Sequence, residues 1–300
     1  MSQLLFQCFC GLTLLLLSCH ASASAIDRFG NPAQLKDYDK YGNQQYNPMF
    51  DLGSWHGFLL PSEQSALGAF AGPMVITQEY SLYLANTLEK LRITNSENQR
   101  VFDFTSAQQR LISTPGKLSQ HYEFDHLIVT LELVFVTNRS ALVTTTLINK
   151  TASELSLTLQ WQGQLLSQWS DEKTLAQAQP SWQRNLSATD QGVTIAFSSI
   201  RSPWHLMTSD SSSYQIARSQ PATTEINQAN HSYQSVSSQT LQPNGSSAIY
   251  TTHSYWHNAA ESKQAKVGIQ AILNAPQPYI AQTEQRWQGY LTTGIKKHSA

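Results

Sequence analysis

The stretch "LSLTLQWQG", residues 155–163, shows most clearly how this chain folds. Its apolar side chains occupy every second position from Leu155 to Trp161, and Ser, Thr and Gln occupy the positions between them. Because successive side chains of a strand point to opposite faces, this period of two predicts a strand with one buried face and one wet face.

Similar stretches recur along most of the chain. They are "LIVTLELVFVTN" (127–138), "ALVTTTLIN" (141–149), "GVTIAFSSI" (192–200) and "SAIYTTHSYW" (247–256). Turn-rich pieces such as Pro243-Asn244-Gly245 separate them, and no regular alternation of strands with helices is visible. The sequence therefore predicts a mainly β protein of stacked antiparallel sheets rather than a parallel α/β domain.

Helical patterns occur only near the C-terminus. Asn258 followed by Glu261 is typical of a capping box, and the helix that it starts should end before Pro276. A second helix is indicated by an apolar stripe that contains Trp287, and Gly294 is expected to end it. There is no internal repeat and no long linker, so residues 26–300 are predicted to form one domain.

The composition argues against a nucleic-acid partner. The 300 residues carry 19 Lys and Arg against 20 Asp and Glu, a net charge of −1, and only 13% of the residues are charged. No basic field is therefore available to gather phosphates. A surface made of Ser, Thr, Gln and Asn suits an exported protein that meets neutral, hydroxyl-rich ligands.

Residues 1–25 are predicted to be an export signal. The run "LLFQCFCGLTLLLLSC" (4–19) is uncharged, apolar and too short to span a membrane. Two endings compete: small residues in "ASASA" (21–25) allow cleavage after Ala23 or Ala25, and "LLSC" resembles a lipobox that would leave a lipidated Cys19. The expected location is periplasmic or secreted, with membrane attachment only if Cys19 is lipidated.

Cysteine use follows from this prediction. Cys8, Cys10 and Cys19 are the three cysteines of the chain, and all lie in the predicted signal. Residues 26–300 therefore hold no disulfide, no thiolate nucleophile and no cysteine metal site.

The sequence contains none of the specific catalytic or phosphate-binding motifs, such as a nucleophile elbow, a phosphate loop or HExxH. "HYEFDH" (121–126) places His121, Glu123 and Asp125 on one face of a predicted strand, where an exposed polar face is favoured over a metal site. His253 and His257 have the spacing of helical zinc ligands, but a strand is expected to end between them. We therefore predict no metal and no cofactor.

"NPMFDLGSWHGFLLP" (47–61) is the one stretch dense in potential site residues. Glycines flank Trp55 at 53 and 57, so a ligand or backbone could approach its ring closely, as sugar rings do on aromatic side chains. Packing in the core is the alternative for Trp55. Asp51 is expected to accept backbone hydrogen bonds in a turn.

Five stretches together resemble the N-terminal domain of bacterial glycoside hydrolase family 63 α-glucosidases. They are "LKDYDKYGNQQYNPMFDLGSWHGFLLP" (35–61), "GAFAGPMVITQEY" (68–80), "SYQIARSQPATTEIN" (213–227), "YTTHSYW" (250–256) and "PYIAQTEQRWQGYL" (278–291). The resemblance implies an inverting, exo-acting α-glucosidase built from an N-terminal β-supersandwich and a catalytic (α/α)6 barrel. This chain looks like the first of these two domains.

In this family both catalytic carboxyl groups come from the barrel, where inverting hydrolysis needs them roughly 6.5 to 9.5 Å apart. The resemblance therefore implies no catalytic residue in this chain. It places "FDLGSWHG" at the seam between sandwich and barrel, so Asp51, Trp55 and His56 are candidates for the rim of the substrate site or for the domain interface.

Three functions remain in view. The first is a non-catalytic domain of an exported α-glucosidase, truncated or half of a split enzyme, with an (α/α)6 barrel as its partner in trans. The alternative is a free-standing periplasmic carbohydrate-binding protein or lipoprotein, with an α-glucoside as its ligand. The third is a complete hydrolase whose site is built on the sandwich itself.

Overall fold

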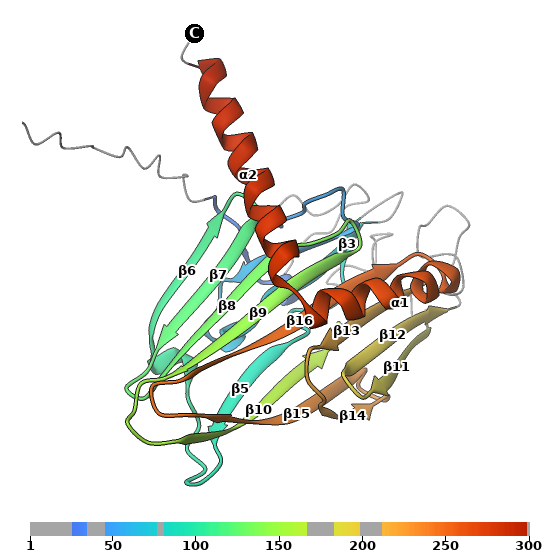
Figure 1. Cartoon of the computed structure of the whole chain (residues 1–300). Helices are drawn as coiled ribbons and strands as arrows, with labels where there is room; N and C mark the ends of the chain where they lie inside the picture. Colours follow the sequence, from blue (N-terminus) through green and yellow to red (C-terminus); the bar gives the residue numbers. More distant parts are fainter. Residues whose placement is uncertain (1–25, 35–45, 77–80, 167–182, 199–211, 299–300) are drawn as a thin grey trace, which may run out of the picture.

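The computed structural model describes residues 26–34, 46–76, 81–166, 183–198 and 212–298. Within these residues the chain forms three β-sheets and two C-terminal helices (Figure 1). The predicted export signal, with its three cysteines, lies outside them, as do residues 35–45 and 77–80 of the stretches that carry the family resemblance.

The largest sheet has eight antiparallel strands in the order β11-β12-β13-β16-β9-β8-β7-β6. They are β6 (Gln108–Thr114), β7 (Lys117–Glu123), β8 (Leu127–Phe135), β9 (Ser140–Asn149), β11 (Gln183–Thr189), β12 (Gly192–Ser198), β13 (Ser213–Arg218) and β16 (Ser246–Trp256). The last strand in the sequence, β16, thus lies in the interior of the sheet between β13 and β9.

Two four-stranded sheets complete the β-structure. One has the order β14-β15-β10-β5 and consists of β5 (Lys90–Asn95), β10 (Leu155–Gln164), β14 (Thr223–Asn227) and β15 (Ser232–Leu241). The other has the order β1-β2-β3-β4 and consists of β1 (Phe29–Gly30), β2 (His56–Pro61), β3 (Ala71–Ile76) and β4 (Ser81–Tyr83). Within these sheets the pairing is antiparallel except for the short parallel contact of β1 with β2.

The prediction of a mainly β fold with stacked antiparallel sheets and two C-terminal helices is confirmed. In β10 the residues from Leu155 to Trp161 alternate between buried and partly exposed, as the period of two predicts. The buried side chains of β10 and β5 meet those of β7, β8 and β9 in one continuous core between the β14-β15-β10-β5 sheet and the eight-stranded sheet. Burial of these two inner faces is the main force that holds the sheets together.

Strand β2 runs through the middle of this core. All six of its residues are buried. Leu59 belongs to one hydrophobic cluster, and its neighbours Phe58 and Leu60 belong to another, so both faces of the strand are covered. The second half of the 47–61 stretch is therefore central to the fold.

The helices α1 (Ala259–Asn274) and α2 (Gln277–His298) lie on the side of the eight-stranded sheet that faces away from β10 (Figure 1). Ile269, Ile272 and Leu273 of α1 form a third hydrophobic cluster with outward-facing residues of that sheet, such as Val134 and Leu142. The predicted start of α1 is confirmed, because the Asn258 side chain accepts a hydrogen bond from the Glu261 N–H at 2.9 Å.

Two local predictions are wrong. Helix α2 continues through Gly294 to His298, because a glycine inside a helix costs only about 1 kcal/mol and does not by itself stop the helix. Strand β7 ends at Glu123, so Asp125 lies in the bend that follows and does not share a strand face with His121. Neither helix among the described residues is long and apolar enough to cross a membrane.

Candidate functional site

A tight turn at residues 51–54 leads the chain into β2. The Ser54 N–H donates to the Asp51 carbonyl at 2.9 Å, and Leu52 and Gly53 both have positive φ angles, of 56° and 68°. Glycine adopts this conformation without steric cost, whereas Leu52 is held there by the turn. The turn places Asp51 and Trp55 on either side of an exposed loop tip.

Asp51 joins this turn to helix α2. Its Oδ2 accepts a hydrogen bond from the Trp287 indole at 2.8 Å and forms an ion pair with Arg286. Its Oδ1 accepts from the Leu52 N–H at 2.7 Å, as expected for a carboxylate in a turn. Only 8% of the Asp51 side chain is exposed, so the carboxylate has a structural role in holding the turn against α2.

Trp287 lies directly over the turn between β6 and β7. A Cβ added to Gly116 in that turn would overlap the Trp287 indole, and Gly116 has a φ of +78°. Glycine at this position therefore satisfies two requirements, the left-handed backbone and the close approach of the ring.

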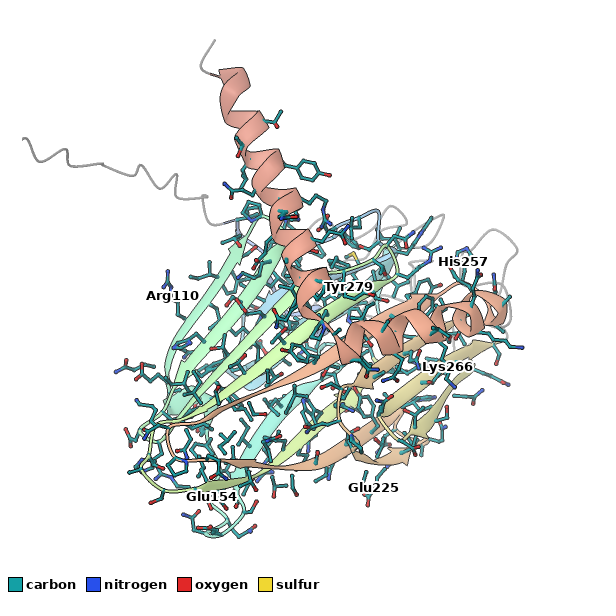
Figure 2. The ribbon with its side chains drawn as sticks, in the orientation of Figure 1. Arg110, Glu154, Glu225, His257, Lys266 and Tyr279 are labelled. Carbon is teal, nitrogen blue, oxygen red and sulfur yellow. The ribbon has the colours of Figure 1, made fainter. Side chains whose placement is uncertain are left out.

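Trp55 is half-buried, and polar groups surround its ring. The Arg139 guanidinium carbon lies 5.9 Å from the centre of the indole, and the His257 ring lies 6.0 Å from it at a tilt of 47°. The pair with Arg139 has the geometry of a cation–π contact. Figure 2 shows His257 beside the N-terminal end of α1.

Glu261 fixes the position of both neighbours of Trp55. Its Oε1 accepts from Arg139 Nε at 2.6 Å, and its Oε2 accepts from the His257 backbone N–H at 2.7 Å. Burial and the nearby Arg139 charge lower the pKa of His257. A carboxylate, a guanidinium, an imidazole and an indole thus converge where β16 ends and α1 begins, which the sequence did not reveal because the hairpin that carries Arg139 is more than 100 residues away.

His56 lies in the core and not at the surface. It is completely buried, and Phe58, Phe135 and Tyr214 surround its ring. Its Nε2 lies 3.2 Å from the His253 carbonyl, and burial lowers its pKa to about 3. The structure therefore separates His56 from its neighbour Trp55, which remains partly accessible.

His253 and His257 are also separated. His253 is buried in β16 with its Nδ1 3.1 Å from the Tyr214 hydroxyl, and burial lowers its pKa to about 3. His257 follows the end of that strand, as the sequence indicated. Among the described residues, no three side chains of His, Cys, Asp or Glu come together as metal ligands would.

A buried ion pair that the sequence did not predict lies between the eight-stranded sheet and the β14-β15-β10-β5 sheet. The Arg218 side chain is fully buried, pairs with Glu89 and places its guanidinium carbon 4.5 Å from the centre of the Trp161 ring. Burial raises the pKa of Glu89, and Arg218 and Tyr233 oppose this effect. The pair joins β13 to the segment that leads into β5, and its place deep in the core makes it a structural contact.

Several solved structures show a partial similarity to this chain. A kojibiose phosphorylase from the human microbiome is 9% identical, with a TM-score of 0.49, and the match covers 89% of this chain and 35% of that one. A polysaccharide lyase is 7% identical, with a TM-score of 0.42 and coverage of 65% and 31%. A heparan sulfate lyase from Pedobacter heparinus is 12% identical, with a TM-score of 0.33 and coverage of 55% and 23%. The chain thus spans about a third of the length of the first two structures.

The family comparison is direct. Residues 27–288 match the family described as "Glucosidase YgjK, N-terminal". The matched range contains every sheet, all of α1 and the first half of α2, including the 51–54 turn, Trp55 and the Trp287 contact. The chain therefore belongs to the family of YgjK-type glucosidase N-terminal domains.

Proposed function

We propose that this chain is the non-catalytic domain of an exported, inverting α-glucosidase of the glycoside hydrolase family 63 type. It docks against an (α/α)6 catalytic barrel, carried either by the same polypeptide or by a separate one. The match to a glucosidase N-terminal family over residues 27–288 is the observation that carries this proposal.

The surface around Trp55 supports a docking role. Asp51 fixes the 51–54 turn to α2, and Glu261 fixes Arg139 to the start of α1. Trp55 is therefore held in one orientation before a partner arrives, and a pre-ordered aromatic side chain loses little entropy on binding. Tryptophan and arginine are also the side chains that most often dominate interface energies.

Helix α2 supports the same role. It extends beyond the edge of the sheet (Figure 1), and Tyr290 and Leu291 on its outer part are 59% and 37% exposed. Large apolar side chains on a projecting helix lose contact with water when a second body covers them. We propose that the barrel covers this part of α2 together with the Trp55 surface.

The barrel is proposed to supply both catalytic carboxyl groups. Two of the three carboxylates that the 47–61 and 121–126 stretches offer already serve other contacts: Asp51 pairs with Arg286, and Glu123 pairs with Lys150 at 2.6 Å. We expect the purified chain to release no glucose from α-glucosides above background. Glucose release that survives repurification and is abolished by Asp51→Asn or Glu123→Gln would instead support a site on the sandwich.

Docking can be tested by titrating the chain with a separately expressed barrel of this family in a calorimeter. Trp55→Ala should weaken binding by about tenfold or more, since truncation of a central aromatic side chain typically costs more than 1 kcal/mol. Ser238→Ala, an exposed strand residue on the opposite side of the molecule, is the matched control and should leave the affinity unchanged. Absence of binding heat, with the chain a monodisperse monomer, would contradict the proposal.

A free-standing periplasmic carbohydrate-binding protein or lipoprotein is the second candidate. It is favoured by a hollow lined with amide and hydroxyl side chains on the outer face of the β14-β15-β10-β5 sheet. The neighbouring reading frame separates the two candidates, because a split enzyme requires a barrel that lacks its own sandwich to be encoded there.

A further inference from the structure

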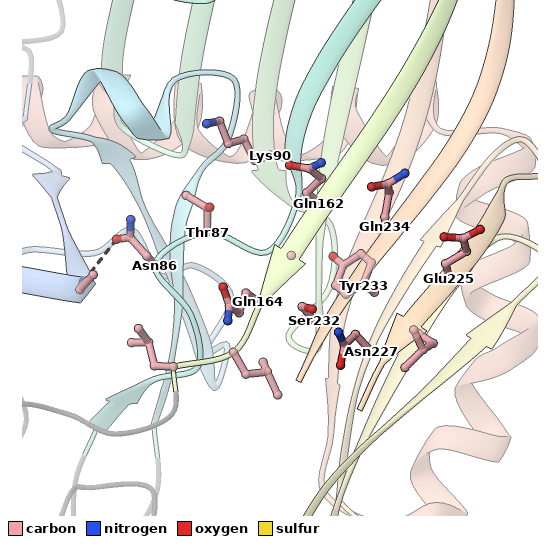
Figure 3. Close-up of a pocket in the computed structure, with 15 residues that line it drawn as sticks. Asn86, Thr87, Lys90, Gln162, Gln164, Glu225, Asn227, Ser232, Tyr233 and Gln234 are labelled. Carbon is pink, nitrogen blue, oxygen red and sulfur yellow. Dashed lines mark hydrogen bonds between the residues drawn. The ribbon is translucent and has the colours of Figure 1, made fainter. Parts of the chain in front are cut away.

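The outer face of the β14-β15-β10-β5 sheet contains a hollow of about 750 Å³. Figure 3 shows side chains from all four strands, with Asn86 and Thr87 of the segment before β5, around this hollow. Its volume lies within the range of about 300 to 1,000 Å³ that is typical of small-molecule sites.

Strand register places four of these side chains in one row. Glu225 is opposite Gln234, Gln234 is opposite Gln162, and Gln162 is opposite Lys90. Directly opposite residues of neighbouring strands point to the same face, so the row runs across the whole sheet. A second row, Asn227, Ser232 and Gln164, follows two residues further along each strand.

The side chains of the first row are free to bind a ligand. Gln162, Gln234 and Glu225 make no side-chain hydrogen bond to any part of the described chain, although they stand side by side on one surface. Each glutamine amide offers two donors and a carbonyl acceptor. The floor of the hollow includes Tyr233, whose hydroxyl points inward to Glu89, so the floor is rigid.

From this arrangement we infer that the hollow binds a neutral oligosaccharide. A sugar hydroxyl both donates and accepts hydrogen bonds, and rows of amide and hydroxyl side chains meet both needs. Among the described residues, Lys90 and Glu225 are the only charged side chains that line the hollow, and their signs are opposite, so neither a phosphate nor an anionic polymer gains from binding to them. The assignment gives the second candidate function a specific site.

A peptide fits this surface less well. Peptides that extend a sheet bind to the unpaired backbone of an edge strand. The centre of the hollow lies over β10 and β15, which are the two inner strands of the sheet and have their backbone groups paired on both sides. The side chains, and not the backbone, are what this face presents.

The hollow is also distinct from the proposed barrel interface. None of Trp55, Tyr290 and Leu291, through which the barrel is proposed to bind, lines the hollow. Helices α1 and α2 pack on the face of the eight-stranded sheet that points away from the hollow (Figure 1). Saccharide binding at the hollow and barrel docking can therefore succeed or fail independently.

The test is calorimetric titration of the full chain with three probes: maltohexaose, its β-linked counterpart cellohexaose, and an uncharged Gly/Ser-rich peptide. We expect at least one of the two saccharides to bind, with an affinity that changes little with salt because no charge is neutralised. The variant Gln162→Ala/Gln234→Ala should weaken that binding by about tenfold, since two hydrogen-bonding side chains are lost. Ser232→Trp, which fills the hollow, should abolish it.

Gln108→Ala/Gln109→Ala on the exposed edge strand β6 is the matched control and should bind as the wild type does. A melting temperature close to that of the wild type confirms that each variant is folded. The inference is overturned if neither saccharide binds, if both hollow variants bind them as the wild type does, or if the peptide alone binds.

Discussion

Asp51 connects two segments that lie 235 residues apart in the chain. The Asp51 carboxylate faces two guanidinium groups there, that of the ion-paired Arg286 and that of the nearby Arg28. Burial lowers the pKa of Arg28, and the charge of Asp51 opposes this effect. Within the described part of the chain, Nε of Arg286 and Nε and Nη1 of Arg28 are buried without a hydrogen-bond partner. The site thus depends on the single negative charge of Asp51.

We predict that Asp51→Asn destabilises the domain by about 2 kcal/mol, because it removes the negative charge that faces two partly buried guanidinium groups. Urea unfolding of the variant and the wild type measures this difference. Asp125→Asn, which removes an exposed carboxylate, is the control and should stay within about 0.5 kcal/mol of the wild type. Equal losses in the two variants would contradict the role of the Asp51 ion pair.

The buried histidines His56 and His253 predict a loss of stability on acidification. Burial lowers both pKa values to about 3, whereas in the unfolded chain they return to about 6.5. Between these values the unfolded state binds protons that the folded state does not, so stability falls as the pH decreases below about 6.5.

Each of these histidines should contribute about 1.4 kcal/mol per pH unit in that window. His56→Phe keeps an aromatic ring among the same aromatic neighbours and removes one titrating group. We expect the plot of unfolding free energy against pH, measured from pH 7 to 5, to be less steep for this variant by that amount. Subtracting the slope of the variant from that of the wild type cancels the contributions of other titrating groups, such as Glu89. Parallel plots for the two proteins would contradict the prediction.

At the scale of elements, the contact of α2 with the β6-β7 turn shows how a helix is held on a sheet edge. The helix reaches this turn with Trp287, and the turn accepts the indole only because Gly116 has no side chain. Ile280, nearer the start of the helix, packs against the cluster that α1 forms on the sheet. The helix is therefore fixed at two points, and its exposed outer part extends beyond the second.

Two glycine variants separate backbone strain from loss of this contact. Gly116 and Gly53 have similar positive φ angles, but a Cβ at Gly53 would meet nothing within 4 Å. Gly53→Ala should therefore cost about 1 kcal/mol, the strain of the left-handed backbone alone. Gly116→Ala should cost about 3 kcal/mol, because overlap with Trp287 adds to the strain. Urea unfolding measures both values, and equal costs would show that Trp287 moves aside freely.

The sequence predicted the elements better than it predicted their contacts. Strands β8, β9, β10, β12 and β16 were visible because apolar and polar residues alternate along them, and the start of α1 was visible in Asn258 and Glu261. Strand β2 was not recognised as a doubly buried strand, although "GFLLP" is a short apolar run of the kind that such strands show. His56 was instead assigned to the rim of a site because the family resemblance placed its stretch at the seam between the two domains.

The hollow shows a different limit of sequence reasoning. The alternation in β10 indicated a polar face, but the other residues of the row, Lys90, Gln234 and Glu225, come from distant parts of the chain. Which residues stand opposite one another depends on the register of four strands, and a shift of one residue would move every side chain to the other face. Only the assembled sheet reveals the row.

At the scale of the whole molecule, the prediction that remains to be tested is export. The apolar run of residues 4–19 and the small residues at 21–25 predict removal of the N-terminal segment. Mass spectrometry of the protein made in its own host should find a mature N-terminus after Ala23 or Ala25. A diacylglyceryl group on Cys19 would select the lipoprotein alternative, and an intact Met1 in the cytoplasmic fraction would contradict export.

The position of β16 also determines when this protein can fold during its synthesis. Residues 246–256 complete the interior of the eight-stranded sheet, where they separate β9 from β13. Until the ribosome has released them, β9 and β13 each present an unpaired strand edge, and such edges promote aggregation. The nascent chain must therefore stay protected over most of its length, so its yield should depend more strongly on chaperones than its final stability would suggest.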